Sequence, residues 1–217
     1  GGVGAGPLDV VLPAPLLVSL LRGCARPAVR TAAREGLAIL GDRAHDELFS
    51  AMRSPDDALR RDASLILSRQ LVARAVPVLA RSLAENPDDE VLGQELVILT
   101  CVDFRDEPLP ADRWFQWWDE VDRRDPFSWF LAALERRNLR APRFDEFAGE
   151  GTREARLFLL TIISEVGEPM LAERALRELE RMHGSELGPL PMESKRRADW
   201  LVRTREIVVP LEDGGSR

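Results

Sequence analysis

The sequence predicts an all-α fold, an α-solenoid of stacked antiparallel helical hairpins. A Pro- or Asp-rich turn, followed by a helix that opens on an aliphatic residue, recurs about every thirty residues, at Pro27, Pro55 and Pro87. A period of this size is typical of helical hairpins that bury their apolar faces against one another. The chain is also rich in Ala, Leu, Arg and Glu and has few runs of β-branched residues. Helices are therefore expected throughout, with strands absent or incidental.

The N-terminal helices follow from proline, glycine and apolar spacing. Because proline is tolerated in the first turn of a helix, Pro13 and Pro15 predict a helix that runs to about Arg22. Four apolar residues at helical spacing then predict a helix over 29–40, which Gly41 ends. These two helices form the first hairpin.

The next two units repeat this arrangement. A helix over 44–52 precedes the second phrase, whose helix carries an apolar stripe that begins at Leu59. The third hairpin is expected over 74–84 and 91–101. Here Leu92 replaces the arginine of the earlier phrases, so the match to the repeat is weaker.

A tryptophan-rich helix is expected over 112–121. Trp114, Trp117 and Trp118 fall at i, i+3 and i+4, the spacing of one helical face. We expect all three to be mainly buried and to close the stack. A further amphipathic helix is expected over 126–138.

A second helical module is expected after Gly151, with helices over 154–166 and 170–182 and a later helix that contains Trp200. The predicted organisation has four parts. They are a flexible segment over 1–13, a repeat array over 14–138, a related helical module over 139–208 and a tail over 209–217.

These motifs carry a family resemblance. The helix after Pro27 resembles the second helix of HEAT or HEAT-like repeats, through Val29, Arg30, Ala32, Ala33, Leu37, Ile39, Leu40 and Gly41. With the Leu59 and Val91 units, Leu99-Thr100, Asp103-Phe104 and the tryptophan helix, residues 14–122 look like a bacterial HEAT-repeat protein. The resemblance implies an α-solenoid used as a protein-binding scaffold, with no shared catalytic residue. Leu92 and the irregular stretch 102–111 depart from a regular superhelix.

Composition bears on the class of partner. The net charge of −7 and pI near 5.1 argue against nucleic acid, because that affinity depends largely on Lys and Arg. The apolar stretch 8–21 is interrupted by two prolines and is shorter than the roughly 20 residues of a membrane span, so no span is expected. The glycine-rich start without Met suggests a missing targeting segment. We expect a soluble protein, and the cytoplasm and the bacterial periplasm or exterior stay open.

No catalytic, cofactor-binding or metal-ligating residue is predicted. Cys24 and Cys101 lie 77 residues apart in apolar contexts and are expected to be buried free thiols. The two histidines, His45 and His183, have no second His or Cys at ligand spacing. No cofactor is expected.

The alternative is an enzyme on the same kind of fold, either a DNA glycosylase for alkylated bases or a bilin lyase-like protein. Trp114, Trp117 and Asp119 would be the nearest candidates for a glycosylase. Such an enzyme needs a basic groove, whereas residues 85–125 hold 13 acidic and 4 basic residues, a net charge of −9.

The same acidic stretch suggests a partner surface. We expect one edge of the array to dock a basic protein segment, with Phe115, which lies off the tryptophan spacing, as its apolar contact. The acidic residues assigned to this edge are Asp88, Asp89, Glu90, Asp119 and Glu120. The alternative is that they cap or solvate helices, since acids favour helix starts and exposed faces.

Overall fold

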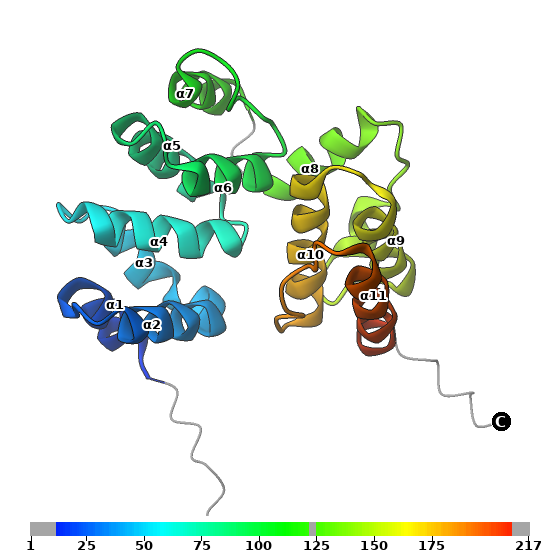
Figure 1. Ribbon diagram of the computed structural model, residues 1–217, viewed down its shortest axis with the longest axis horizontal. Coiled ribbons are helices and arrows are strands. Elements are labelled where there is room, and N and C mark those ends of the chain that lie inside the picture. Colours follow the sequence, from blue (N-terminus) through cyan, green and yellow to red (C-terminus); the bar gives the residue numbers. More distant parts are fainter. Residues whose placement is uncertain (1–11, 122–124, 210–217) are drawn as a thin grey trace, which may run out of the picture. The chain divides into compact units, whose positions relative to one another are not determined.

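The computed structural model describes residues 12–121 and 125–209 (Figure 1). The regular structure in these ranges is entirely helical, so the all-α part of the prediction is confirmed. The chain divides into two compact units, Gly1–Leu67 and Ser68–Arg217, which are described separately. Most of the expected flexible start and tail lies outside the described residues.

The first unit contains three α-helices and the greater part of a fourth. Its helices are α1 (Ala14–Gly23), α2 (Pro27–Leu40), α3 (His45–Ala51) and α4 (Asp57–Arg69), whose last two residues belong to the second unit. α1 packs against both α2 and α3. The approach to α2 is close at Gly36, where an added Cβ would lie 3.0 Å from a methyl group of Leu17.

Charged residues join α2 to α4 inside the first unit. Nη2 of Arg30 donates to Asp62 at 2.7 Å, and Nη2 of Arg34 donates to the other carboxylate oxygen at 2.6 Å. The Asp62 side chain is almost fully buried, whereas the arginine side chains are 28% and 42% exposed. Arg30, the arginine of the repeated phrase, therefore ties α2 to α4.

The second unit contains the remaining helices, coloured from green to red in Figure 1. They are α5 (Val76–Glu85), α6 (Glu90–Thr100), α7 (Pro110–Glu120), α8 (Pro126–Glu135), α9 (Arg153–Glu165), α10 (Pro169–His183) and α11 (Ser194–Val208). α5 packs against α6 and α7, while α6 also packs against α8 and α10. α9 packs against α10 and α11.

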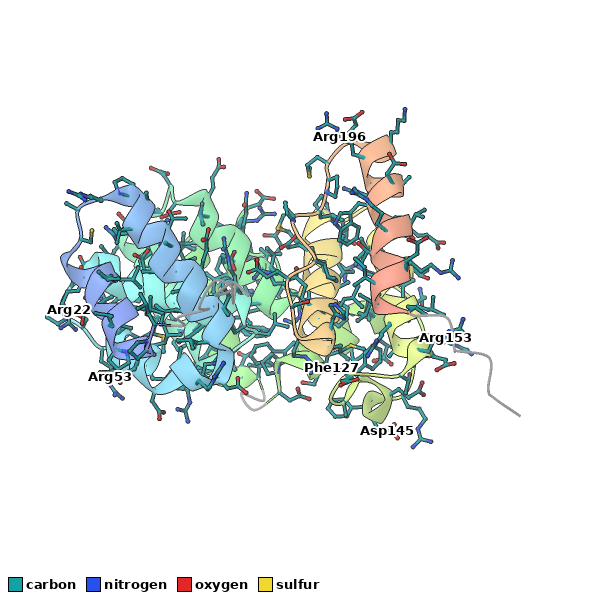
Figure 2. All side chains as sticks on the ribbon, turned by 90° about the horizontal axis from the view of Figure 1, so that it is seen from below. Arg22, Arg53, Phe127, Asp145, Arg153 and Arg196 are labelled. Atoms are coloured by element: carbon teal, nitrogen blue, oxygen red, sulfur yellow. The ribbon has the colours of Figure 1, made fainter. Side chains whose placement is uncertain are left out.

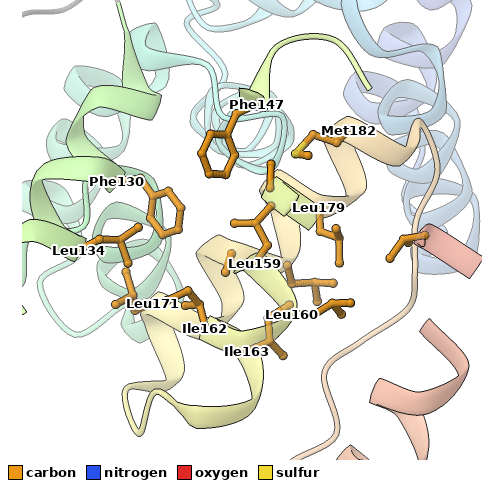
Figure 3. Close-up of a cluster of buried hydrophobic side chains, with 14 of the residues drawn as sticks. Phe130, Leu134, Phe147, Leu159, Leu160, Ile162, Ile163, Leu171, Leu179 and Met182 are labelled. Carbon is orange, nitrogen blue, oxygen red and sulfur yellow. The ribbon is translucent and has the colours of Figure 1, made fainter. Parts of the chain in front are cut away.

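An apolar cluster of this unit lies among α8, α9 and α10, with Trp200 and Val208 of α11 at its edge (Figure 3). Phe130 of α8, Leu159 of α9 and Leu179 of α10 are fully buried there. Position 151 favours glycine because its φ is +70°, in the left-handed region. An added Cβ would also lie 1.8 Å from the terminal methyl of Met182, which would have to move.

The tryptophan helix α7 is less deeply buried than its spacing suggests. Trp114 is fully buried, with Phe104 edge-on at a centroid distance of 5.5 Å. Trp117 and Trp118 are only half-buried, and their rings meet that of Trp129 edge-on at 5.0 and 6.2 Å. The expectation that all three are mainly buried is therefore correct for Trp114 alone, because α7 packs chiefly against α5 and its other ring positions reach the edge of the helix layer.

Candidate functional site

The acidic residues that follow α5 divide into two kinds. Asp88 and Glu90 are exposed. Asp89 is the N-cap of α6, where its carboxylate accepts hydrogen bonds from the backbone amides of Val91 at 3.1 Å and Leu92 at 3.3 Å. Asp89 therefore stabilises the helix start, whereas Asp88 and Glu90 present their charges to solvent.

The other acidic residues assigned to the edge lie in the last turn of α7. Asp119 and Glu120 are exposed, and Glu120 accepts a long hydrogen bond from Gln116 at 3.4 Å. Phe115 is half-buried. Because α7 packs on α5 and Asp88 lies in the turn that follows α5, both acidic groups are on elements that adjoin one helix.

Several other acids in this stretch already have basic partners. Asp103 pairs with Arg105 at 2.6 Å, and Glu107 pairs with Arg113 at 2.8 Å. The guanidinium of Arg105 holds the pKa of Asp103 below its usual range. The negative charge of 85–125 is thus partly neutralised, and the charge of Arg105 also interacts with that of Glu90.

A set of polar side chains that the sequence analysis missed lies mainly between α6 and α10. All of its members are buried except Arg181, whose side chain is 42% exposed. We call this set the polar seam and define it as Ser68, Glu95, Arg174, Arg177, Glu178 and Arg181. Its centre is a two-pronged pair in which Arg177 donates to both carboxylate oxygens of Glu95, at 2.8 and 2.9 Å. Ser68 donates to the same carboxylate at 3.0 Å. Both charged side chains of the pair are 7% exposed.

The pair is ionised in spite of its burial. Desolvation opposes the charge on Glu95, but the hydrogen bonds and charge of Arg177 and the hydroxyl of Ser68 outweigh it, so its pKa is below the usual range. Burial likewise opposes the charge on Arg177, and Glu95 outweighs it, so the pKa of Arg177 is raised. The seam therefore carries permanent charges in the interior.

Arg174 is the most buried member of the seam. It donates to the backbone carbonyl of Leu99 at 2.6 Å, to that of Pro126 at 2.9 Å and to Glu178 at 2.8 Å. The carbonyl of Leu99 belongs to the last turn of α6, which ends at Cys101 in the left-handed conformation with a φ of 57°. Arg174 thus satisfies carbonyls at a helix C-terminus, where a positive charge is favoured.

A pocket of about 260 Å³ adjoins the polar seam. We call it the aromatic pocket. Its walls include the rings of Phe127, Phe144 and Phe147, and its polar lining includes Asp125, Glu178 and Arg181. Phe127 packs against the rings of Phe144 and Phe147 at centroid distances of 5.6 and 4.8 Å. Figure 2 shows Phe127 and Asp145 toward the end of this unit opposite Arg196.

A second pocket, of about 240 Å³, lies where Cys101 meets the start of α10. Its lining includes an ion pair between Arg137 and Glu168, in which Nε donates at 2.6 Å, and the pKa of Glu168 is lowered by this bond. Burial raises the pKa of the Cys101 thiol, so the thiol is neutral at ordinary pH. Cys24 and Cys101 are free, as expected, but both residues are half-buried rather than fully buried.

The residues considered for an enzyme are not brought together around either pocket. Trp114 and Trp117 pack into the helix layers, and Asp119 is exposed on α7. His45 lies 3.5 Å from Asp42, which is fully exposed. Among residues 12–121 and 125–209 no group of three or more His, Cys, Asp or Glu side chains is placed to hold a metal ion.

No family model, curated protein or solved structure matches this chain. Over the described ranges, none of the helices has the length and apolar character needed to cross a membrane. The assignment of function therefore rests on the geometry of the chain itself.

Proposed function

We propose that this chain is a HEAT-like α-solenoid segment that acts as a non-enzymatic protein-binding scaffold. In this proposal residues 14–138 form the array, and residues 139–208 form a related module that continues it. The proposal draws support from packing between helices that are close in sequence, such as α5 with α6 and α9 with α10. Packing dominated by near neighbours is characteristic of repeat arrays, which offer extended surfaces to partners.

The observation that carries the proposal is a group of exposed carboxylates on neighbouring elements. We define the acidic edge as Asp88, Glu90, Asp119 and Glu120. Asp88 has no ion pair within the described ranges, and Glu90 is exposed at the first turn of α6. Exposed carboxylates on neighbouring elements create a negative potential that attracts a basic segment and disfavours acidic ones.

The proposed partner is a basic protein segment that binds with a marked dependence on salt. Interactions between exposed charges are screened over about 8 Å at physiological ionic strength. A partner held by the acidic edge should therefore bind most tightly at low salt. Nucleic acid is not the proposed partner, because it carries the same sign of charge as this edge.

The test is a selection of displayed random peptides on the immobilised full chain. Wild-type protein is compared with the double variant Asp88→Lys/Glu90→Lys. Asp89 is kept, since loss of its cap alone would cost about 1 kcal/mol of stability. We expect the wild type to enrich peptides with a net positive charge and the variant to retain them at least about tenfold less well.

The matched control is Glu154→Lys/Glu165→Lys, which makes the same change of charge on the exposed ends of α9. Glu154 lies in a first helical turn, as Glu90 does, so these two substitutions perturb a helix dipole alike. Glu165 lies in a last turn, where lysine is favoured, so the control matches the change of charge and not every dipole effect. Peptide enrichment should survive in this control. Enrichment that is equal in both variants and indifferent to salt would refute the acidic edge as the binding surface.

A further inference from the structure

We infer that the aromatic pocket receives one apolar side chain of a partner polypeptide, of the size of Leu, Met or Phe. Arg181 and Asp125 would hold backbone groups of the partner beside it. This inference rests on the proposed protein-binding function and specifies the partner residue that would anchor there.

The size of the pocket favours a single side chain. Its volume of about 260 Å³ lies below the 300 to 1,000 Å³ that is usual for pockets of drug-sized ligands. Apolar residues make up more than half of its lining, with three phenylalanine rings beside Leu71, Pro126 and Ala148, and the polar residues are Gln70, Asp125, Glu178 and Arg181. A ligand that enters it therefore covers mainly apolar surface and can meet polar groups beside it. An apolar side chain fits both the volume and the lining.

Phe144 marks the mouth of the pocket. It packs against Phe127, yet 57% of its surface is exposed. Phe147, on the same short helical turn over 144–147, is fully buried. Phe144 is thus an exposed ring that packs on the half-buried Phe127 beside the pocket. Such rings often dominate protein interfaces, because covering them removes apolar area from water.

The polar groups of the pocket match a peptide backbone. Both oxygens of Glu178 are occupied, by Arg174 at 2.8 Å and by Nε of Arg181 at 2.9 Å. Nη2 of Arg181 donates to the carbonyl of Phe147 at 3.0 Å, which leaves Nη1 without a partner among the described residues. Oδ1 of Asp125 accepts a hydrogen bond from the backbone amide of Phe127 at 3.0 Å. Oδ2 of Asp125 has no hydrogen-bond partner among the described residues.

A donor on Arg181 and an acceptor on Asp125, of opposite charge, suit a carbonyl and an N–H group better than they suit a charged ligand, and the amide of Gln70 in the same lining is neutral. A basic side chain would meet Arg181, and an acidic one would meet Asp125. The charges therefore favour a neutral anchor residue, even where the flanking residues of the partner are basic and reach the acidic edge.

The pocket is also held in shape before any partner binds. Arg181 is fixed through Glu178 to Arg174, whose side chain is fully buried and bonded to backbone carbonyls. Groups that are already ordered lose less conformational entropy on binding, so a small pocket can anchor a peptide usefully.

The experiment uses four small probes on the isotope-labelled full chain, followed by backbone amide NMR. The probes are the N-acetyl amides of L-phenylalanine, L-leucine, L-glutamate and glycine. The phenylalanine and leucine probes should give saturable shifts at Phe144, Ala148 and Arg181. The glycine probe should bind at least about tenfold more weakly, because it lacks the buried apolar side chain.

Two variants locate the binding. The first variant is Ala148→Trp, in which an exposed residue of the lining is replaced so that the new ring fills the pocket. The control is Val202→Trp, which adds the same ring at an exposed position of α11. Saturable binding should disappear in the first variant and persist in the second, with unchanged circular dichroism in both. Three results would overturn the inference. They are equal shifts in both variants, no saturable shifts in the wild type, and tighter binding of the glutamate probe than of the apolar probes.

The outcome separates this inference from the wider proposal. If the probes do not bind saturably while enrichment of basic peptides still requires Asp88 and Glu90, the pocket assignment is wrong and the proposed binding function is retained. If the probes bind saturably while the selection enriches no basic peptides, the pocket assignment is retained and the acidic edge is rejected as a binding surface.

Discussion

The two units use charged residues between helices in different ways. In the first unit, Asp62 is shared by two arginines whose side chains are 28% and 42% exposed. In the second unit, Glu95 and Arg177 are each 7% exposed and bond through both prongs of the guanidinium. In the first arrangement the second arginine bonds to Asp62 directly, whereas in the second Arg69 reaches Glu95 only at 3.9 Å and is itself 70% exposed. Loss of Arg177 therefore leaves the buried Glu95 carboxylate with only a long, solvent-screened contact to a positive charge.

This difference indicates which helix contacts are costly to break. Exposed pairs contribute little because water screens them, while buried pairs are costly to break. We therefore expect the polar seam to fix the relation between α6 and α10 and to support the aromatic pocket beside it. The ion pairs of Asp62 with Arg30 and Arg34 should contribute only modestly to the stability of the contact between α2 and α4.

The largest expected effect is at the seam. Arg177→Met should lower the free energy of unfolding by about 3 to 5 kcal/mol, because it leaves the Glu95 carboxylate buried without its main partner. The double variant Glu95→Leu/Arg177→Met should recover most of this loss, since it removes both charges. Urea unfolding of the two variants measures the difference, and a double variant as unstable as the single one would contradict a pairing role.

A similar contrast of burial applies within α7. Trp114→Ala should cost about 3 to 5 kcal/mol, because the ring is fully buried and its removal leaves a cavity. Trp117→Ala should cost less, at about 1 to 3 kcal/mol, since the ring is half-buried and part of its apolar area is already in water. Thermal unfolding compares the variants, and equal losses would show that Trp117 is as well packed as Trp114.

The seam should also make stability depend on acid. Because the folded-state pKa of Glu95 lies below its ordinary value of 4.5, its contribution is present above that value and is lost as the pH falls through the folded pKa. Unfolding should therefore become easier on acidification below about pH 4.5. The Glu95→Leu/Arg177→Met variant should show a shallower fall, as measured by urea midpoints from pH 6 to pH 3, and an unchanged slope would exclude Glu95 as a source.

The smallest effect is expected in the first unit. Arg34→Met should reduce stability by no more than about 1 kcal/mol, because Arg34 is partly exposed and Arg30 still pairs with Asp62. The loss should shrink further in high salt, where Arg177→Met should lose almost none of its effect. A larger loss at Arg34 than at Arg177 would reverse the comparison between the units.

Local signals made the helices predictable. The prolines before α2, α4 and α6 and the capping carboxylate Asp89 act within a few residues, so the sequence places these helix starts within a few positions. The predicted C-terminal end of one helix lies too far along the chain. Residues 126–138 were expected to be a single helix, but α8 ends at Glu135 and Asn138 takes a left-handed conformation with a φ of 57°.

The seam and the pocket depend on contacts that local patterns do not encode. Glu95 and Arg177 lie 82 residues apart. One signal was available, because Glu95 stands four residues after Val91, at the position where Ala33 and Ala63 are buried in the earlier phrases. A carboxylate on an apolar stripe implies a buried partner, but it does not identify which residue supplies it.

The most direct test of the central claim, that the second unit binds protein segments, is site-specific photo-crosslinking. A peptide selected on the wild-type chain is irradiated with protein that carries p-benzoylphenylalanine at Asp88, Ala148 or Ile39, the last being an exposed apolar residue of the first unit. We predict crosslinks from positions 88 and 148 that excess unlabelled peptide suppresses, and none above background from position 39. Suppressible crosslinks from position 39 alone would place recognition in the first unit and contradict the claim.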